Sequence, residues 1–135
     1  MDCIFCKIIK KEIPAKIIFE NEKYLSFLDI TPNTIGHALV IPKKHINNFV
    51  EQSSEEAAEH IKVVHQIAGQ LQNILGADGF NITINNGQAA GQIINHVHWH
   101  IIPRYENDGL LHFAHSEEAK SKLDETLKKI NAQIK

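Results

Sequence analysis

The sequence predicts an α+β fold: a five-stranded antiparallel sheet, one long helix and a C-terminal helix. Short runs rich in β-branched and aromatic residues, separated by turn residues, predict the strands. Residues 57–75 instead repeat apolar side chains in steps of four and three, which predicts a helix between the third and fourth strands. This order of elements is typical of an α+β domain.

Turn residues and prolines set the limits of the individual strands. The predicted strands cover residues 16–20, 24–28, 37–41, 80–84 and 96–102. The polar loop 21–23 predicts a hairpin between the first two strands, and Pro32 breaks the chain in the turn that follows. Pro42 and Pro103 end the third and the last strand, because proline lacks the amide hydrogen that a sheet ladder needs.

Helix signals occur at three places. Residues 3–10 can form a short helical turn that directs Ile4, Phe5 and Ile8 inward. A capping box, Ser53-Ser-Glu-Glu56, precedes the long helix and Gly76 ends it. Its apolar stripe consists of Ala57, Ile61, Val64, Ala68, Leu71 and Leu75. Ser116 opens the C-terminal helix, whose apolar face carries Leu123, Leu127, Ile130 and Ile134.

Length and composition suit one domain, residues 1–135, with a core at 1–104 and a helical tail at 105–135. A net charge of −2 without a basic cluster argues against nucleic-acid binding. No segment is apolar enough for a membrane span or a secretory signal, so we expect a cytoplasmic protein. In that reducing setting, the pair Cys3 and Cys6 is more typical of metal binding or redox chemistry than of a disulfide.

Three histidines occupy alternate positions in the last predicted strand. Since strand side chains alternate, His96, His98 and His100 should project from one face. The opposite face should carry Val97, Trp99 and Ile101. Three adjacent imidazoles are poor core material, because each buried ring needs partners for two nitrogens. They can hold a catalytic zinc, or one can attack phosphorus directly, and spacing alone does not choose between these mechanisms.

The residues around these histidines favour direct attack on phosphorus. The run His96-Val-His-Trp-His-Ile-Ile102 matches the motif His-φ-His-φ-His-φ-φ, with φ apolar, at every position. Gly91-Gln92 precedes it, Pro103-Arg104 follows it, and Leu-Val-Ile-Pro-Lys-Lys-His45 lies about fifty residues earlier. The chain resembles the histidine triad (HIT) family over nearly its whole length. Asparagine at position 85 resembles the Hint-like branch of the family. The N-terminal cysteine pair resembles that of bacterial-type members.

The resemblance implies an enzyme, a nucleotide hydrolase or transferase of the HIT fold that acts as a homodimer. His98 would attack the α-phosphorus of a purine nucleoside phosphoramidate or a related nucleotide, forming a nucleotidyl-histidine. His100 would contact the phosphate oxygens and assist the leaving group. The bound partner would be a purine nucleotide such as AMP or GMP. Asp29 would bind the ribose. The implied nucleotide-binding residues are Ile4, Phe5, Ile8, Phe27, Asp29, Ile30, Asn85, Gly91, Gln92, Ile93, His98 and His100. Ile93 departs from the family, which usually has serine or threonine there.

A structural zinc is the second implication of the resemblance. Its ligands would be Cys3, Cys6, His45 and His96, whereas His98 would work without metal. The cysteine pair alone also fits an incidental or a redox pair.

Two rival functions remain open: a zinc-dependent hydrolase with the triad as ligands, and a nucleotide-binding module without catalysis. A chelator would abolish the activity of the first rival at once, whereas the HIT mechanism would lose at most stability. The second rival would bind nucleotide without turnover. His60 and His65 are expected to be solvated or edge residues of the long helix.

Overall fold

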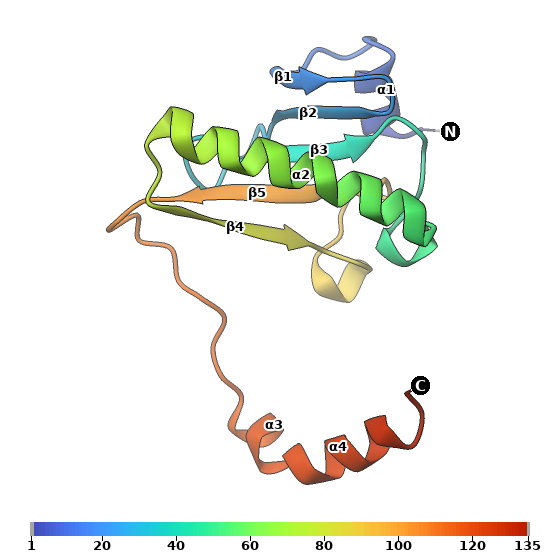
Figure 1. Ribbon diagram of the computed structural model, residues 1–135, viewed down its shortest axis with the longest axis vertical. Coiled ribbons are helices and arrows are strands. Elements are labelled where there is room, and N and C mark those ends of the chain that lie inside the picture. Colours follow the sequence, from blue (N-terminus) through green and yellow to red (C-terminus); the bar gives the residue numbers. More distant parts are fainter. Residues whose placement is uncertain (1, 135) are drawn as a thin grey trace.

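Five antiparallel strands form a sheet in the order β1-β2-β3-β5-β4 (Figure 1). The strands are β1 (Ile17–Glu20), β2 (Tyr24–Leu28), β3 (Ala38–Pro42), β4 (Gly79–Ile84) and β5 (Trp99–Arg104). The helices are α1 (Ile4–Ile9), α2 (Ser54–Leu75), α3 (Glu117–Ser121) and α4 (Leu123–Asn131), with 3-10 turns at Phe49–Glu51 and Gln88–Ala90. This computed structural model describes residues 2–134. The predicted α+β fold with an antiparallel sheet is confirmed.

Helices α1 and α2 lie on opposite faces of the sheet (Figure 1), and each face carries an apolar cluster of buried side chains. Because side chains alternate along a strand, β3 directs Leu39 and Ile41 toward α1 and Val40 toward α2. All five residues of β3 are buried. The strand is therefore the common floor of both clusters, and its α1 side carries the candidate site.

Helix α2 begins and ends with the predicted caps. The side chain of Ser53 accepts from the Glu56 amide at 3.1 Å, and the Glu56 carboxylate accepts from the Ser53 amide at 2.8 Å. Gly76 ends the helix at a φ of 64°, where glycine has no steric penalty. The buried stripe is His60, Val63, Val64, Ile67 and Ala68. Val64 and Ala68 are buried as predicted, whereas Ile61, predicted in the same stripe, lies at its edge and is 38% exposed.

His60 is fully buried, so the prediction of a solvated or edge position was wrong. Its Nε2 donates to the Val40 carbonyl at 2.9 Å, and its Nδ1 accepts from the Gln52 side-chain amide at 3.1 Å. The ring also stacks on Tyr24, with centroids 5.3 Å apart. Both ring nitrogens thus have partners, which offsets the cost of burying the imidazole between α2 and the sheet.

Strand β5 begins at Trp99, three residues later than predicted, and continues through Pro103 to Arg104. The reason lies in β3, which ends at Pro42. Proline offers no amide hydrogen, and the Pro42 carbonyl accepts from Nε2 of His96 at 2.8 Å. In the register of β3 against β5, Val97 falls opposite Pro42 and His96 lies beyond the end of β3, and Val97 instead donates its amide hydrogen to the Ile46 carbonyl at 2.7 Å.

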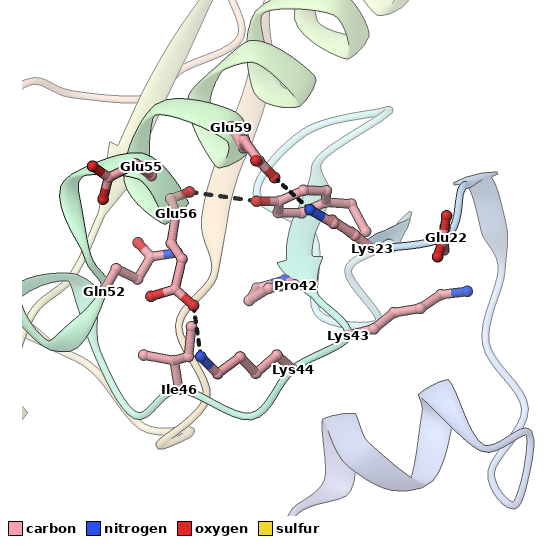
Figure 2. Close-up of a pocket in the computed structure, with 11 residues that line it drawn as sticks. Glu22, Lys23, Pro42, Lys43, Lys44, Ile46, Gln52, Glu55, Glu56 and Glu59 are labelled. Atoms are coloured by element: carbon pink, nitrogen blue, oxygen red, sulfur yellow. Dashed lines mark hydrogen bonds and ion pairs between the residues drawn. The ribbon is translucent and has the colours of Figure 1, made fainter.

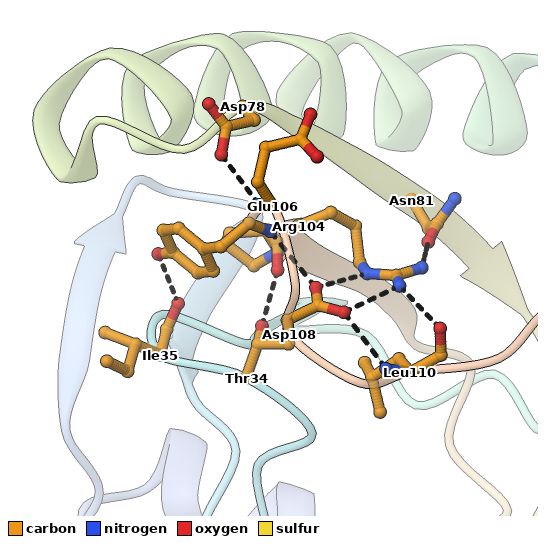
Figure 3. Close-up of polar contacts among 10 residues, drawn as sticks. Thr34, Ile35, Asp78, Asn81, Arg104, Glu106, Asp108 and Leu110 are labelled. Carbon is orange, nitrogen blue, oxygen red and sulfur yellow. Dashed lines mark hydrogen bonds and ion pairs between the residues drawn. The ribbon is translucent and has the colours of Figure 1, made fainter.

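A turn held by Arg104 follows β5 (Figure 3). The guanidinium donates to both carboxylate oxygens of Asp108, at 2.8 and 2.9 Å, and also to Asn81 and to the Leu110 carbonyl. This bidentate ion pair holds the pKa of Asp108 well below its usual range. The turn fixes where the chain leaves the sheet.

The segment beyond this turn extends away from the sheet and ends in α3 and α4 (Figure 1). The single predicted helix is interrupted at Lys122, where the backbone leaves helical geometry. Its apolar face is exposed, with Leu123 at 65%, Leu127 at 56%, Ile130 at 47% and Ile134 at 69%. The predicted single domain stays a prediction, and residues 1 and 135 at its ends lie outside the described range. No helix among residues 2–134 is long and apolar enough to cross a membrane.

Candidate functional site

A cavity of about 350 Å³, here called the nucleotide cavity, lies on the α1 side of the sheet. Every residue predicted for nucleotide binding except Gln92 lines it. These residues are Ile4, Phe5, Ile8, Phe27, Asp29, Ile30, Asn85, Gly91, Ile93, His98 and His100. The lining is therefore mostly apolar and also carries one carboxylate, one amide and two imidazoles.

Helix α1 supplies the apolar wall. Ile4, Phe5 and Ile8 fall on one side because residues four apart lie one turn above each other. Phe5 meets Phe27 edge to face at 5.5 Å and His98 at 5.2 Å. Such an apolar slot with a ring edge at its base suits a flat, stacking ligand such as a nucleobase.

The two ring nitrogens of His98 differ, because Nδ1 is hydrogen-bonded to the backbone and, among residues 2–134, Nε2 is not. Its Nδ1 lies 2.7 Å from the carbonyl oxygen of His96, which can only accept, so Nδ1 carries the proton. Nε2 therefore holds a lone pair. Burial lowers the pKa of the His98 ring, although the hydrogen bond to His96 opposes this shift. The ring is thus neutral at pH 7, which is the form that a nucleophile needs.

His100 is oriented by His37, a residue that the sequence reasoning did not assign to the site. The Asn33 amide donates to Nδ1 of His37 at 3.0 Å, so the His37 proton sits on Nε2. That Nε2 donates to Nδ1 of His100 at 2.9 Å. His100 must then carry its own proton on Nε2. Burial, together with the neighbouring imidazoles of His98 and His37, lowers the pKa of His100 to about 4, so it serves as a neutral hydrogen-bond donor.

Asp29 combines turn chemistry with a position in the cavity lining. Its Oδ1 accepts from the amide and the hydroxyl of Thr31, at 2.9 and 3.1 Å. Its Oδ2 lies 3.6 Å from Nε2 of His37. Burial lowers the pKa of His37 while the charge of Asp29 opposes that shift. The Thr31 contacts fix one carboxylate oxygen, so the carboxylate faces the cavity in a defined orientation.

Gln92 stabilises the loop that borders the cavity. Its Nε2 donates to the carbonyls of Asn47 at 2.7 Å and Ile94 at 3.0 Å, while its Oε1 accepts from the Gly87 amide at 2.9 Å. Gly91 has a φ of 92°, a conformation that other residues rarely adopt. The Gln92 side chain therefore shapes the loop from behind, and the Gly91 backbone is the part that meets the cavity.

A second group of side chains, the Cys/His cluster, lies beside the histidine segment. It consists of Cys3, Cys6, His45 and His96, whose ligand atoms all lie within 4.8 Å of one another. Nδ1 of His96 is 3.5 Å from Sγ of Cys3 and 3.6 Å from Sγ of Cys6, and Nδ1 of His45 is 3.3 Å from Sγ of Cys6. Tetrahedral zinc would separate sulfur and nitrogen ligands by roughly 3.6 Å. The spacing fits zinc.

The proton positions in this cluster also fit a metal. Nε2 of His96 donates to the Pro42 carbonyl at 2.8 Å, and Nε2 of His45 faces Oδ1 of Asn47 at 3.0 Å. Both Nδ1 atoms therefore present lone pairs to the cysteines, with the second nitrogen held as in known metal sites.

The group Asp29, His37 and His100 has similar spacing but the opposite proton arrangement. A metal on Nε2 of His37 would require a proton on Nδ1, where the Asn33 amide already donates. This group is therefore a hydrogen-bonded pair beside a carboxylate rather than a metal ligand set.

Another cavity of about 350 Å³ lies between the β3 end and α2 (Figure 2). Two ion pairs join residues of its lining, Lys44 with Glu56 at 2.8 Å and Lys23 with Glu59 at 3.5 Å. These pairs are exposed and mutually neutralising, so they offer no reactive group.

The chain is similar to known proteins over most of its length. The HIT domain matches residues 10–107. An uncharacterized HIT-like protein of Methanocaldococcus jannaschii is 52% identical over 128 residues, which cover 95% of this chain and 98% of that protein. The adenosine 5'-monophosphoramidase of Schizosaccharomyces pombe is 43% identical over 104 residues, which cover 77% of this chain and 75% of that protein.

Two crystal structures extend the similarity to three dimensions. A HIT family protein from Bacillus subtilis has a TM-score of 0.87 and 38% identity, covering 100% of this chain and 99% of that one. A Zn-bound histidine triad family protein from Mycobacterium smegmatis has a TM-score of 0.78 and 38% identity, covering 98% and 97% of the two chains. With the family domain spanning most of the sequence and the histidine motif in place, the chain belongs to the HIT family.

Proposed function

We propose that this protein hydrolyses purine nucleoside phosphoramidates, or transfers their nucleotide, through a nucleotidyl intermediate on His98. One observation carries the proposal. The hydrogen bond from Nδ1 of His98 to the His96 carbonyl, 2.7 Å long, leaves an Nε2 lone pair on a neutral imidazole that lines the nucleotide cavity. The similarity to an adenosine 5'-monophosphoramidase supports the same chemistry.

In the first step, Nε2 of His98 forms a bond to the α-phosphorus and the phosphorus–nitrogen bond breaks. The amine leaves with that bonding pair and with a proton that its nitrogen has taken from solvent. His98 becomes a cationic nucleotidyl-imidazole, still bonded through Nδ1–H to the His96 carbonyl. Water then attacks phosphorus, loses a proton to solvent and releases the nucleotide. This divides one difficult displacement into two easier ones.

The other cavity residues position the nucleotide. Nε2–H of His100 donates to a phosphate oxygen, and the backbone amides near Gly91 stabilise charge on the phosphoryl group. Asp29 accepts hydrogen bonds from the ribose hydroxyls. The base of AMP or GMP lies in the apolar slot between Phe5 and Phe27 and their neighbours. We assign the chain to the Hint-like branch on the strength of Asn85, whose amide contacts the Gly91 carbonyl at 3.4 Å.

We propose that zinc occupies the Cys/His cluster as a structural ion. The cluster ties α1 to the segment before β5, and α1 forms the wall of the nucleotide cavity. Bound zinc would hold that wall in place without taking part in the reaction. A cytoplasmic setting keeps Cys3 and Cys6 as the free thiols that such a site requires.

We also propose that the protein is a homodimer. The apolar face of α4 is exposed on a segment apart from the sheet, and a helix of nine residues is not stable in water by itself. β4 is also an edge strand. Both features need a partner surface, and a second copy supplies it.

The proposed function is tested by turnover of adenosine phosphoramidate in three samples: untreated protein, protein treated with chelator, and His98→Ala. We expect activity in the first two and a loss of at least about a thousandfold in the variant. Immediate loss on chelation at a temperature where the protein stays folded would support the zinc-dependent hydrolase instead. Nucleotide binding with no turnover in any sample would support the non-catalytic module.

A further inference from the structure

The cysteine pair of the Cys/His cluster encloses two residues of the nucleotide cavity wall. In the run Cys3-Ile4-Phe5-Cys6, both middle residues line that cavity. Phe5 is buried, and its ring meets the His98 ring edge to face at 5.2 Å. The first turn of α1 therefore belongs both to the cluster and to a part of the wall that packs against the nucleophile. A chemical change at the two sulfur atoms acts directly on this wall.

The two sulfur atoms are close enough to react with each other. Both cysteines are free, and their Sγ atoms lie within 4.8 Å of each other. Sγ of Cys3 also accepts from the amide of Cys6 at 3.4 Å. A disulfide joins its sulfurs at about 2 Å, so the pair closes with a relative movement of less than about 3 Å. The chain has no other cysteine, so each thiol has only the other as a partner within it.

A cavity of about 590 Å³ gives small molecules access to this pair and has no role in the mechanism above. It is lined by Asp2, Cys3, Ile4, His45, Asn47, Ile93, Ile94 and Asn95. Cys3 itself is 8% exposed, so it is sheltered from bulk solvent but borders an opening of the size that ligands occupy. A reagent that enters this cavity therefore meets Cys3 before Cys6.

We propose that Cys3 and Cys6 form a reversible disulfide, with a small-molecule disulfide as oxidant, and that this bond opens the Cys/His cluster and loosens the wall of the nucleotide cavity. The effect on nucleotide binding rests on the function proposed above. The Cys3 thiolate attacks one sulfur of the oxidant, and a thiolate leaves with the bonding pair. The Cys6 thiolate then attacks Sγ of Cys3 and displaces the second thiolate. The cysteines lose two electrons, and the oxidant gains them as two thiols that take their protons from solvent.

Oxidation removes two of the four ligands of the cluster. Zinc binds the thiolate form of cysteine, and His45 and His96 alone do not complete a tetrahedral set. The cluster then no longer ties α1 to the segment before β5, so Ile4 and Phe5 keep their positions by apolar packing only. A nucleotide has to order both side chains as it binds, and we expect its Kd to rise about tenfold.

The catalytic step itself changes little on oxidation. The carbonyl of His96 fixes the tautomer of His98, and this carbonyl belongs to the backbone rather than to the cluster. We therefore expect the disulfide to raise the Kd of the nucleotide and to leave kcat nearly unchanged.

The test treats zinc-loaded protein with oxidised glutathione, and then with dithiothreitol and zinc. We expect the protein to lose the mass of two hydrogens and to release its zinc. The amides of Lys7 and Lys10, which donate to the carbonyls of Cys3 and Cys6, should exchange hydrogen faster. The Kd of AMP, measured by calorimetry, should rise about tenfold. Dithiothreitol with zinc should reverse all four changes, whereas zinc alone should not.

Two controls isolate the disulfide. Cys6→Ser cannot form the bond, so its zinc content and its Kd for AMP should be the same before and after the oxidant. Reduced wild type that a chelator has stripped of zinc should take zinc back without a reductant. A glutathione adduct as the final product, a link between two chains, or a disulfide that leaves zinc content and hydrogen exchange unchanged overturns the proposal.

The same measurements separate this proposal from the proposed function. Turnover that needs His98, with a zinc content and a Kd that the oxidant does not change, keeps the function and rejects the disulfide switch. A disulfide that expels zinc and speeds exchange in α1, in a protein that neither binds AMP nor turns over an adenosine phosphoramidate, keeps the switch and rejects the function.

Discussion

The imidazoles of His37 and His100 share one hydrogen bond, with Nε2 of His37 2.9 Å from Nδ1 of His100. His37 therefore dictates the tautomer of His100 without lining the nucleotide cavity itself. We expect His37→Ala to lower kcat by about 10- to 100-fold, while KM for an adenosine phosphoramidate changes much less, because the nucleotide contacts remain. Steady-state kinetics checks this split.

Two further variants serve as controls for that experiment. His37→Gln keeps a side-chain N–H donor and should recover part of kcat. His65→Ala removes an exposed histidine of α2 and should behave as wild type. Equal loss in His37→Ala and His37→Gln, or a rise in KM alone, would show that His37 does not act through His100.

The second prediction concerns pH and the buried His60. Burial lowers its pKa from 6.5 to about 4. The unfolded chain takes up a proton near pH 6.5 and the folded protein only near pH 4. The stability that this group contributes is therefore complete above pH 6.5 and is lost as the pH falls toward 4, by about 3 kcal/mol in all.

Urea unfolding of wild type and His60→Leu at pH 7 and pH 4 measures this contribution. The variant is less stable at pH 7, because it leaves the Val40 carbonyl without its donor. Its free energy of unfolding should fall less with pH than that of wild type. The other buried histidines are present in both proteins and cancel in the difference. Parallel pH profiles would show that His60 titrates normally.

Removal of the structural zinc is the third prediction. Cys3→Ser should bind less zinc, measured by elemental analysis, and its Tm should fall by more than about 5 °C, because metal binding adds to folding stability. At a temperature where the variant is folded, kcat should stay within about threefold of wild type. His112→Ala, an exposed histidine outside the cluster, is the control. An inactive but folded Cys3→Ser would assign zinc a catalytic role.

The fourth prediction concerns the C-terminal segment. Leu127→Asp places a charge on the apolar face of α4 and should convert a dimer into a monomer in sedimentation velocity runs. Thr126→Asp adds the same charge at the adjacent exposed position and should leave the dimer intact. Dimers in both variants would show that α4 lies outside the interface, and a monomeric wild type would contradict the homodimer itself.

Features encoded by local patterns could be predicted from the sequence. Caps such as Ser53 and Gly76 depend on residues close in the chain, and the structure has both. The alternation of the histidines also survives, although β5 starts only at Trp99. Phe5 contacts both His96 and His98 from the α1 side, while Trp99 packs with the α2 cluster. In the Cys/His cluster only the pair Cys3 and Cys6 has a local signal, and the addition of His45 and His96 rested on the family resemblance, because both lie far from that pair in the chain.

Features set by packing between elements could not be predicted. The approach of His37 to His100 depends on the register of β3 against β5, in which Leu39 pairs with His100. A register is fixed by the whole sheet and cannot be read from one strand. The burial of His60 depends on how α2 is oriented about its axis against the sheet, which buries His60 and leaves Ile61 at the edge of the contact. Neither relationship leaves a pattern in the sequence.

The proposed reaction depends most directly on a covalent bond between phosphorus and one imidazole nitrogen. Protein mixed with an adenosine phosphoramidate and quenched in base should yield a peptide that contains His98 with the added mass of the nucleotide, located by tandem mass spectrometry. The adduct should disappear when water has completed the reaction, and it should be absent from His98→Ala. The same mass on another residue, or full turnover by His98→Ala, would contradict the mechanism.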